Sequence, residues 1–147
     1  MAESVREVMT ANPTTLSMNA TVADAARVMR DHDIGDVMVL DEGDVLCGIV
    51  TDRDLVVRAV ASDRLPAEVQ IGEICSRVLT TIDIDASVKD AVSLMRDEAL
   101  RRLPVVDKGL PVVDKGKPAG IVSLGDLAVD RDPSSMLADI SAAPVNT

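Results

Sequence analysis

Hydrophobic and polar positions follow a helical period in two stretches of the chain, and each stretch opens on the same kind of signal. Residues 21–24 have the pattern Thr-x-x-Asp and residues 87–90 the pattern Ser-x-x-Asp. Each pattern is a capping box, in which a hydroxyl and a carboxylate satisfy backbone N–H groups at the start of a helix. The spacing predicts that the apolar face of the first helix consists of Val22, Ala25, Ala26 and Met29.

After each predicted helix the pattern changes to short runs that are rich in β-branched residues. Each first run is followed by a polar turn, a second run and a short helix that begins at Thr51 or Ser123. With an opening strand before the long helix, each half is predicted to be a β-α-β-β-α unit, so the fold class is α/β (α+β). The runs cover residues 37–41, 45–50, 103–107 and 119–122.

The two halves are related by an internal repeat. When the chain is shifted by 66 residues, the Met-Arg-Asp of residues 29–31 aligns with that of residues 95–97. Beyond the predicted hairpin the shift becomes 72, and GIVTDRDL at 48–55 aligns with GIVSLGDL at 120–127. A unit of about 60 residues is only marginally stable by itself. We therefore expect the two units to pack face to face about a pseudo-two-fold axis, with two symmetric clefts between them.

The repeat predicts the domain organisation. The first domain covers residues 1–60 and the second covers residues 71–130, with a linker at residues 61–70. Residues 131–147 are predicted to form a loose C-terminal tail.

A second, shorter repeat lies inside the second half, where LPVVDKG occurs in tandem at residues 103–109 and 110–116. Either copy could fill the predicted strand. If the first copy fills it, Arg101 and Arg102 stay directly before the strand and the second copy enlarges the hairpin loop. If the second copy fills it, a lysine and a glycine replace the arginines. Extra loop length costs only about 0.6 kcal/mol per doubling, so we predict the first copy in the sheet because it retains the arginines.

Composition and charge narrow the classes of partner. Hydrophobic residues make up 47% of the chain, yet Phe, Tyr and Trp are absent, so aliphatic side chains must form the core and hold any ligand base. The net charge of −10 argues against binding to nucleic acid or to anionic membranes, because neutralising phosphates takes clustered Lys and Arg. A small phosphate site built from a few arginines remains compatible with this charge.

Several other functions lack a sequence signal. No signal-peptide core and no apolar run of about 18 residues occurs, so we predict no membrane segment and expect a cytoplasmic protein. Cys47 and Cys75 are expected to be buried, reduced thiols, and with one His they predict no metal site. No nucleophile–base pair is apparent, so the chain is not expected to be an enzyme.

Taken together, the motifs resemble a pair of cystathionine β-synthase (CBS) domains. Each half has an opening PTT or LTT, a helix like VADAARVM, a strand like LPVVD and a closing sequence like GIVT..D. The resemblance covers residues 4–130, so the chain is similar to a stand-alone CBS pair, often called a Bateman module. It implies two CBS units packed about a pseudo-two-fold axis.

The resemblance also implies a function. It implies a non-catalytic regulatory or sensor module that binds adenosine nucleotides such as AMP, ADP or ATP in the clefts between the two domains. No cofactor is required, and S-adenosylmethionine is a further adenosine-type ligand. A homodimer that acts on an unidentified regulated protein is implied as well. The alternative is a dimeric protein-interaction scaffold whose clefts are vestigial or empty.

Two sequence motifs carry the expected binding site. We name Thr51-x-x-Asp54 the first corner and Ser123-x-x-Asp126 the second corner. In CBS pairs the matching carboxylate accepts hydrogen bonds from the ribose 2′- and 3′-hydroxyls, and the hydroxyl lies near the ribose or phosphate. An ionised carboxylate only accepts hydrogen bonds, which suits a cis-diol. The local pattern alone predicts a helix cap, and the two roles are compatible.

The resemblance assigns phosphate contacts to Arg101 and Arg102 and places them opposite the ribose carboxylate of the other half. One site would then combine the first corner with the arginines and favour phosphorylated adenosines. The other would combine the second corner with Gly35 and Asp36, and would bind an uncharged or cationic adenosyl group or stay empty. The alternative role of the arginines is to place positive charge at a helix C-terminus.

Five further residues complete the predicted site. Arg53 adjoins the first corner and either adds a ligand contact or faces solvent. The threonines of the opening strands line the adenine pocket in this family, although threonine is also an ordinary strand residue. These are Thr14, Thr15, Thr80 and Thr81.

Overall fold

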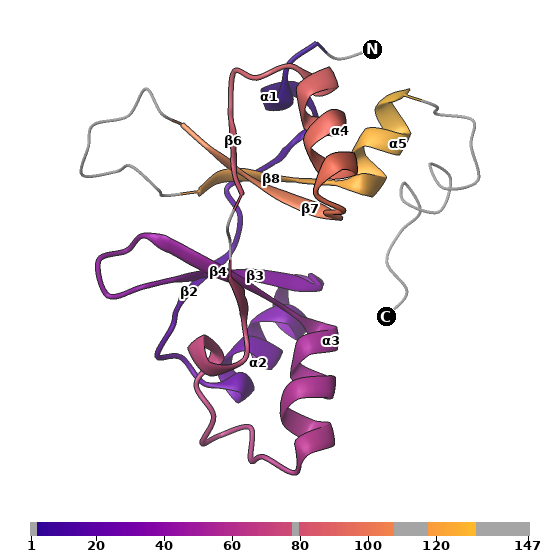
Figure 1. Ribbon diagram of the computed structural model, residues 1–147. Coiled ribbons are helices and arrows are strands. Elements are labelled where there is room, and N and C mark those ends of the chain that lie inside the picture. The colour runs from indigo at the N-terminus through magenta and orange to yellow at the C-terminus, as the bar shows by residue number, and fades with distance from the viewer. Residues whose placement is uncertain (1–2, 78–79, 108–117, 132–147) are drawn as a thin grey trace. The chain divides into compact units, whose positions relative to one another are not determined.

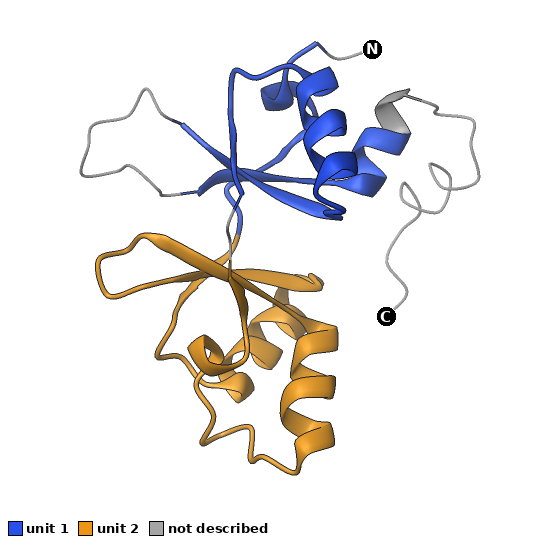
Figure 2. Cartoon of the chain, viewed as in Figure 1, with its two compact units in different colours: residues 1–13, 80–146 blue, residues 14–79, 147 orange. Residues whose placement is uncertain are grey.

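The computed structural model describes residues 3–77, 80–107 and 118–131, which form two compact units (Figures 1 and 2). Of these residues, unit 1 holds 3–13, 80–107 and 118–131, and unit 2 holds 14–77. Each unit has a four-stranded sheet with helices over one face (Figure 1), which confirms the predicted mixed fold class.

Unit 2 has the sheet order β2-β3-β4-β5. Strands β2 and β3 are parallel, and the other two pairs are antiparallel. The helix that follows β4 begins as α3 and continues as a π-helical turn and a 3₁₀ turn. The elements are β2 Thr15–Ser17, α2 Val22–His32, β3 Asp36–Leu40, β4 Leu46–Thr51, α3 Asp52–Asp54, the π-helical turn Leu55–Ala59, the 3₁₀ turns Val60–Ser62 and Ile71–Glu73, and β5 Ser76–Arg77.

Unit 1 repeats this arrangement with the sheet order β1-β8-β7-β6. Strands β6 and β7 are parallel, and β8 runs antiparallel to both β7 and β1. The elements are α1 Val5–Val8, β1 Thr10–Ala11, β6 Ile82–Asp83, α4 Val88–Asp97, β7 Arg102–Val106, β8 Pro118–Ser123 and α5 Leu124–Arg131.

The two repeats exchange their leading segments. Strand β1, from the start of the first repeat, pairs with β8, while its equivalent β5 pairs with β4 of the first repeat. Equivalent backbone bonds occur in both units. Val5 N donates to Ala86 O at 2.8 Å, and Ile71 N donates to Ala20 O at 2.8 Å. Each repeat therefore supplies an edge strand to the unit that the other repeat forms.

Because of this exchange, the compact units do not follow the boundaries drawn from the sequence repeat. Residues 3–13 belong to unit 1, and residues 71–77 belong to unit 2. The stretch 61–70 lies within unit 2, where Val69 is buried and its carbonyl accepts from Val22 N at 2.8 Å. Aligning repeats identifies equivalent strands, but it does not show which copy of a neighbouring strand each one pairs with. The tail from residue 132 onward lies outside the described residues.

Two equivalent glycines make room for the exchanged strands. A Cβ at Gly48 would lie 2.8 Å from the backbone oxygen of Ser76 in β5. A Cβ at Gly120 would lie 2.7 Å from the backbone oxygen of Thr10 in β1. Side chains do not approach a backbone oxygen so closely, so only glycine allows the edge strand to lie against each of these positions.

The long helices begin as predicted, with two differences. Thr21 and Asp24 form the complete capping box, and this hydrogen bonding lowers the pKa of the Asp24 carboxyl. At the start of α4, Ser87 Oγ accepts from Asp90 N at 3.0 Å, but only this half of the box forms. The predicted apolar face of α2 was wrong at Ala26, which is exposed. Val28 is partly buried and packs against the core of unit 2 instead, because the buried stripe runs along positions 22, 25, 28 and 29.

The first LPVVDKG copy fills the sheet, which confirms the prediction. Its residues Leu103–Val106 lie in β7, where Leu103 is opposite Val122 and Val105 is opposite Gly120 in β8. Leu103 and Val105 are fully buried. Arg102 is the first residue of the strand, so the arginine pair keeps its position next to β7. The second copy, residues 110–116, lies outside the described residues.

Candidate functional site

Both corners form in the same way, at the point where β4 or β8 becomes a helix. In the first corner, Thr51 N donates to Asp54 Oδ2 at 2.9 Å and Asp54 N donates to Thr51 Oγ1 at 3.1 Å. In the second corner, Ser123 N donates to Asp126 Oδ2 at 2.9 Å and Asp126 N donates to Ser123 Oγ at 3.0 Å. Each carboxylate is thereby fixed through one oxygen, which leaves the other oxygen able to accept further hydrogen bonds.

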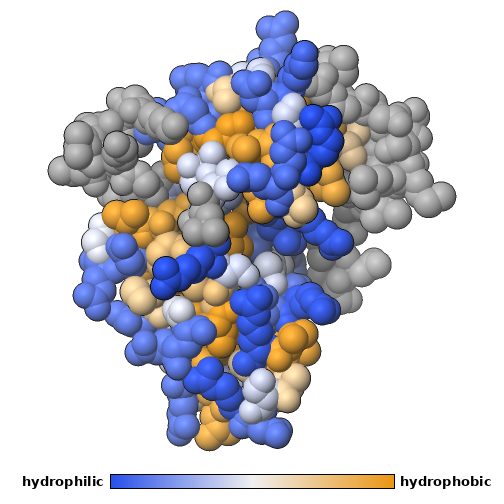
Figure 3. Space-filling model, in the orientation of Figure 1, coloured by the Kyte–Doolittle hydropathy of each residue, from blue (hydrophilic) through white to orange (hydrophobic). Residues whose placement is uncertain are grey.

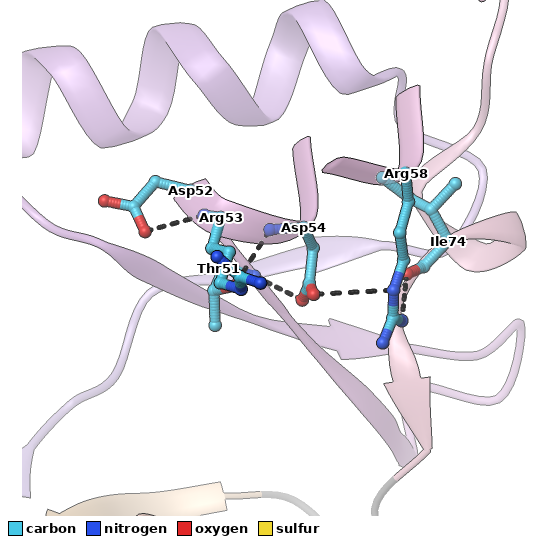
Figure 4. A network of polar contacts seen from close by, with 6 residues as sticks. All are labelled: Thr51, Asp52, Arg53, Asp54, Arg58 and Ile74. Atoms are coloured by element: carbon cyan, nitrogen blue, oxygen red, sulfur yellow. Dashed lines mark hydrogen bonds and ion pairs between the residues drawn. The ribbon is translucent and has the colours of Figure 1, made fainter. Parts of the chain in front are cut away.

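The first corner belongs to a larger polar network (Figure 4). The Asp54 side chain is only 13% exposed, and its Oδ1 lies 3.6 Å from Arg58 Nε. Arg58 Nη1 in turn donates to the carbonyl of Ile74 at 2.8 Å. Arg53 is exposed, and its backbone N–H donates to Asp52 Oδ1 at 2.8 Å. Sequence reasoning missed Arg58, although its i, i+4 spacing from Asp54 is the usual signal for an ion pair on a helix.

The structure brings Arg101 and Arg102 next to the second corner within unit 1. Arg102 lies opposite Ser123 in the β7–β8 pair, and the carbonyl of Arg101 accepts from Leu124 N at 2.9 Å. Arg101 is exposed and Arg102 is half-buried. The first corner, with which the sequence analysis combines these arginines, lies in unit 2. The predicted combination of these arginines with the first corner stays a prediction.

The equivalent place in unit 2 carries no positive charge. Asp36 lies opposite Thr51 in the β3–β4 pair, and the carbonyl of Gly35 accepts from Asp52 N at 3.0 Å. The backbone arrangement therefore matches that around Arg101 and Arg102, while the side chains differ. The difference in charge between the two halves, expected from the sequence, lies at matching positions of the two sheets.

The four threonines lie where the chain passes from one unit to the other. The division between the units falls directly before Thr14 and directly before Thr80. Thr14 and Thr80 are half-buried, whereas Thr15 and Thr81 are exposed. The carbonyl of Thr14 accepts from Met38 N at 3.0 Å, so its backbone is committed to the sheet.

The two cysteines are half-buried free thiols of unit 2. Burial raises the pKa of both, and the nearby Asp41 carboxylate raises that of Cys47 further. Cys47 Sγ donates to the carbonyl of Val39 at 3.3 Å. Both side chains are therefore held in the protonated thiol form at neutral pH.

An apolar cavity lies between α4 and α5 of unit 1 and was not predicted from the sequence. Its volume is about 410 Å³. It adjoins the second corner through Leu124, the first residue of α5, but contains neither corner residue. The walls are formed by Val92, Met95, Arg96, Ala99, Leu100, Leu124, Leu127 and Ala128.

Other classes of site find little support in the part of the chain that the structure describes. Within residues 3–77, 80–107 and 118–131, no three His, Cys, Asp or Glu side chains are grouped to hold a metal ion. None of the helices in these ranges is both long and apolar enough to cross a membrane. Hydrophilic residues are spread over the visible face of both units rather than gathered in one area (Figure 3).

Comparison with known proteins gives consistent matches. The CBS domain-containing protein YhcV of Bacillus subtilis is 38% identical to this chain over 128 residues, which cover 87% of this chain and 85% of YhcV. The crystal structure of Hypoxic Response Protein I, which holds two zinc ions, superposes with a TM-score of 0.70 at 30% identity, covering 85% of this chain and 96% of that one. The CBS domain pair of protein MJ0100, in complex with 5′-methylthioadenosine and S-adenosyl-L-methionine, superposes with a TM-score of 0.74 at 25% identity. The match covers 92% of this chain and 100% of the MJ0100 chain.

The family model for the CBS domain matches residues 5–60, 71–110 and 108–129. The two matches in the second half overlap at residues 108–110, across the junction of the two LPVVDKG copies. Each half thus matches the model, and the matches together cover most of the chain. This chain therefore belongs to the CBS domain family, with one CBS domain in each repeat.

Proposed function

We propose that this chain is a non-catalytic regulatory module that binds an adenosine nucleotide, of the class of AMP, ADP or ATP, through its two corners. The observation that carries the proposal is the first corner. There a largely enclosed carboxylate accepts from the Thr51 backbone N–H through one oxygen and keeps acceptor capacity on the other, while the Thr51 hydroxyl accepts from the Asp54 backbone N–H. An acceptor held in this way suits the two hydroxyls of a ribose.

Two further facts support the adenosine class. The same corner geometry occurs in both repeats, at matching positions of the two sheets. The related pair of protein MJ0100 was crystallised with two adenosine compounds. The net charge of −10 opposes a phosphorylated ligand in general, so such a ligand depends on local cations, and Arg101 and Arg102 beside β7 are the candidates.

A dimeric interaction scaffold is the second candidate, and exposed apolar side chains of unit 2 favour it. Val56 is 58% exposed and Val60 56% exposed on the helical segment that follows the first corner, and Leu65 is 61% exposed just beyond it. Exposed apolar side chains that form one continuous patch are typical of surfaces that bind another protein. A homodimer would be the simplest such assembly.

Thermal unfolding of the full chain with added AMP, ATP, NAD or S-adenosylmethionine distinguishes the two functions. A ligand that binds only the folded state raises the apparent stability by about 2.7 kcal/mol at a concentration of 100 times its Kd. We expect a rise in Tm with at least one adenosine compound and none with a pyrimidine nucleotide. No rise with any of the four would contradict the nucleotide module and favour the scaffold.

Removing the second LPVVDKG copy tests whether Arg101 and Arg102, directly before β7, are already placed to bind a phosphate when both copies are present. Deletion of residues 110–116 leaves Asp107, Lys108, Gly109 and Lys117 to join β7 to β8, a normal hairpin length. We expect unchanged AMP affinity, and a gain in stability of about 1 kcal/mol or less from the shorter loop. A large gain in AMP affinity, measured by calorimetric titration, would contradict this arrangement. Deletion of residues 103–109 gives the same protein sequence, which makes the result independent of the copy removed.

A further inference from the structure

The first corner contains an ion pair that reaches beyond the helix cap. Arg58 Nε lies 3.6 Å from Asp54 Oδ1, and Arg58 Nη1 donates to the Ile74 carbonyl at 2.8 Å (Figure 4). The side chain of Asp54 is 13% exposed and that of Arg58 is 47% exposed. The carboxylate is thus the more enclosed partner, and the guanidinium closes one side of it.

The two contacts of Arg58 come from different parts of unit 2. Arg58 lies in the π-helical turn Leu55–Ala59, directly after α3. Ile74 is buried and lies between the 3₁₀ turn and the exchanged strand β5. A planar guanidinium that is bound at both ends of its fork loses most of its freedom to rotate. Its positive charge therefore stays beside the Asp54 carboxylate.

This contact leaves the carboxylate able to bind a ligand. Asp54 Oδ2 accepts from the Thr51 N–H, and Oδ1 faces Arg58. Each carboxylate oxygen can accept two hydrogen bonds, so both oxygens keep capacity for a hydroxyl donor. Arg58 restricts the rotation of the carboxylate without using up its acceptors.

The second corner has no counterpart to this arginine in its sequence. Under the shift of 72 residues that aligns the two corners, Arg58 aligns with Asp130. The second repeat thus has an acidic residue where the first has a basic one. The sequence therefore gives only the first corner a basic residue four positions after its aspartate.

We propose that Arg58 is a positioning residue, which holds the Asp54 carboxylate in the orientation that accepts a ribose diol and so tightens nucleoside binding at the first corner. This inference rests on the proposed function. Arg58 acts through Asp54 and does not itself contact the ligand, so its effect falls on the nucleoside and does not depend on phosphate.

The test uses full-length chains that also carry Asp126→Ala, so that only the first corner is measured. Calorimetric titration gives the Kd of adenosine and of AMP for Arg58→Gln and Arg58→Lys. We expect Arg58→Gln to weaken both ligands by the same factor, about three- to tenfold, and Arg58→Lys to recover most of that loss. The matched control is Arg64→Gln, which removes an exposed ion pair to Glu73 in the same unit (2.8 Å) and should leave both Kd values unchanged.

A double-mutant cycle separates positioning from a general effect on the fold. In an Asp54→Asn background, Arg58→Gln should have no further effect on adenosine affinity, because the group through which it acts is gone. The proposal would be overturned if Arg58→Gln still weakened adenosine binding in that background, or if it weakened only AMP. Unchanged or tighter adenosine binding in Arg58→Gln would overturn it as well. If the parent chain binds neither adenosine nor AMP, both the proposed function and this inference fail. If the parent chain binds them and Arg58→Gln binds them equally well, only this inference fails.

Discussion

A Val5→Asp substitution is expected to unfold unit 1. Val5 is fully buried in the core of that unit, although it lies at the start of the first repeat. Burying a carboxylate without a partner among aliphatic side chains costs at least about 4 kcal/mol, which is most of the stability of a small domain. A thermal melt followed by circular dichroism should lose most of the cooperative unfolding transition. Hydrogen exchange should show lost protection in β7 and β8.

Matched substitutions separate burial from added charge. Thr10→Asp places the same carboxylate at an exposed position of the same segment and should change the free energy of unfolding by less than about 1 kcal/mol. Ile71→Asp changes the equivalent buried residue of unit 2 and should remove protection in β3 and β4 instead. Wild-type stability in Val5→Asp would show that the exchanged segment does not belong to the core of unit 1.

Loss of the Asp54 carboxylate is expected to weaken nucleoside binding at the first corner strongly. Two charge-assisted hydrogen bonds to a ribose diol disappear in Asp54→Ala, so we expect the Kd of adenosine to rise about 100-fold. Asp54→Asn keeps an oxygen that can still accept from the Thr51 N–H, so it retains the helix cap while losing the charge. Both variants should bind weakly, but only Asp54→Ala should also lose stability.

The control for this prediction is Asp52→Ala, two residues away. Asp52 is exposed at the helix start. Among the described residues, its side chain accepts one hydrogen bond, from the Arg53 N–H. Its removal should leave the Kd of adenosine within about twofold of wild type. The double variant Asp54→Ala, Asp126→Ala should show no rise in Tm with any adenosine compound. Equal binding by Asp54→Ala and Asp52→Ala would contradict the assignment of the first corner as a ribose site.

Features that depend on neighbouring residues could be predicted from the sequence. The capping boxes at Thr21 and Thr51 could be predicted because a hydroxyl and a carboxylate three residues apart come close together at a helix start. The placement of the first LPVVDKG copy in the sheet could also be argued, because the position of the arginine pair before the strand distinguishes the copies.

Features that depend on distant pairing could not be predicted. The two repeats have equivalent leading strands and equivalent partners, so the pattern fits exchange and non-exchange equally well. The Arg58 contact with the Ile74 carbonyl joins residues that meet only because β5 pairs with β4. The position of Arg102 opposite Ser123 follows from the register of one hairpin, and register is set by the whole sheet rather than by the residues themselves.

The exchanged leading segments bear on how a protein of this kind can arise by gene duplication. A polypeptide with a single repeat could build the same units by trading its leading segment with a second copy, as domain-swapped dimers do. Fusing the two genes would turn that trade into an intramolecular step, with an effective concentration on the order of millimolar. The codons for the leading segment of each repeat would then be selected for how well that segment fits the other half of the fused protein.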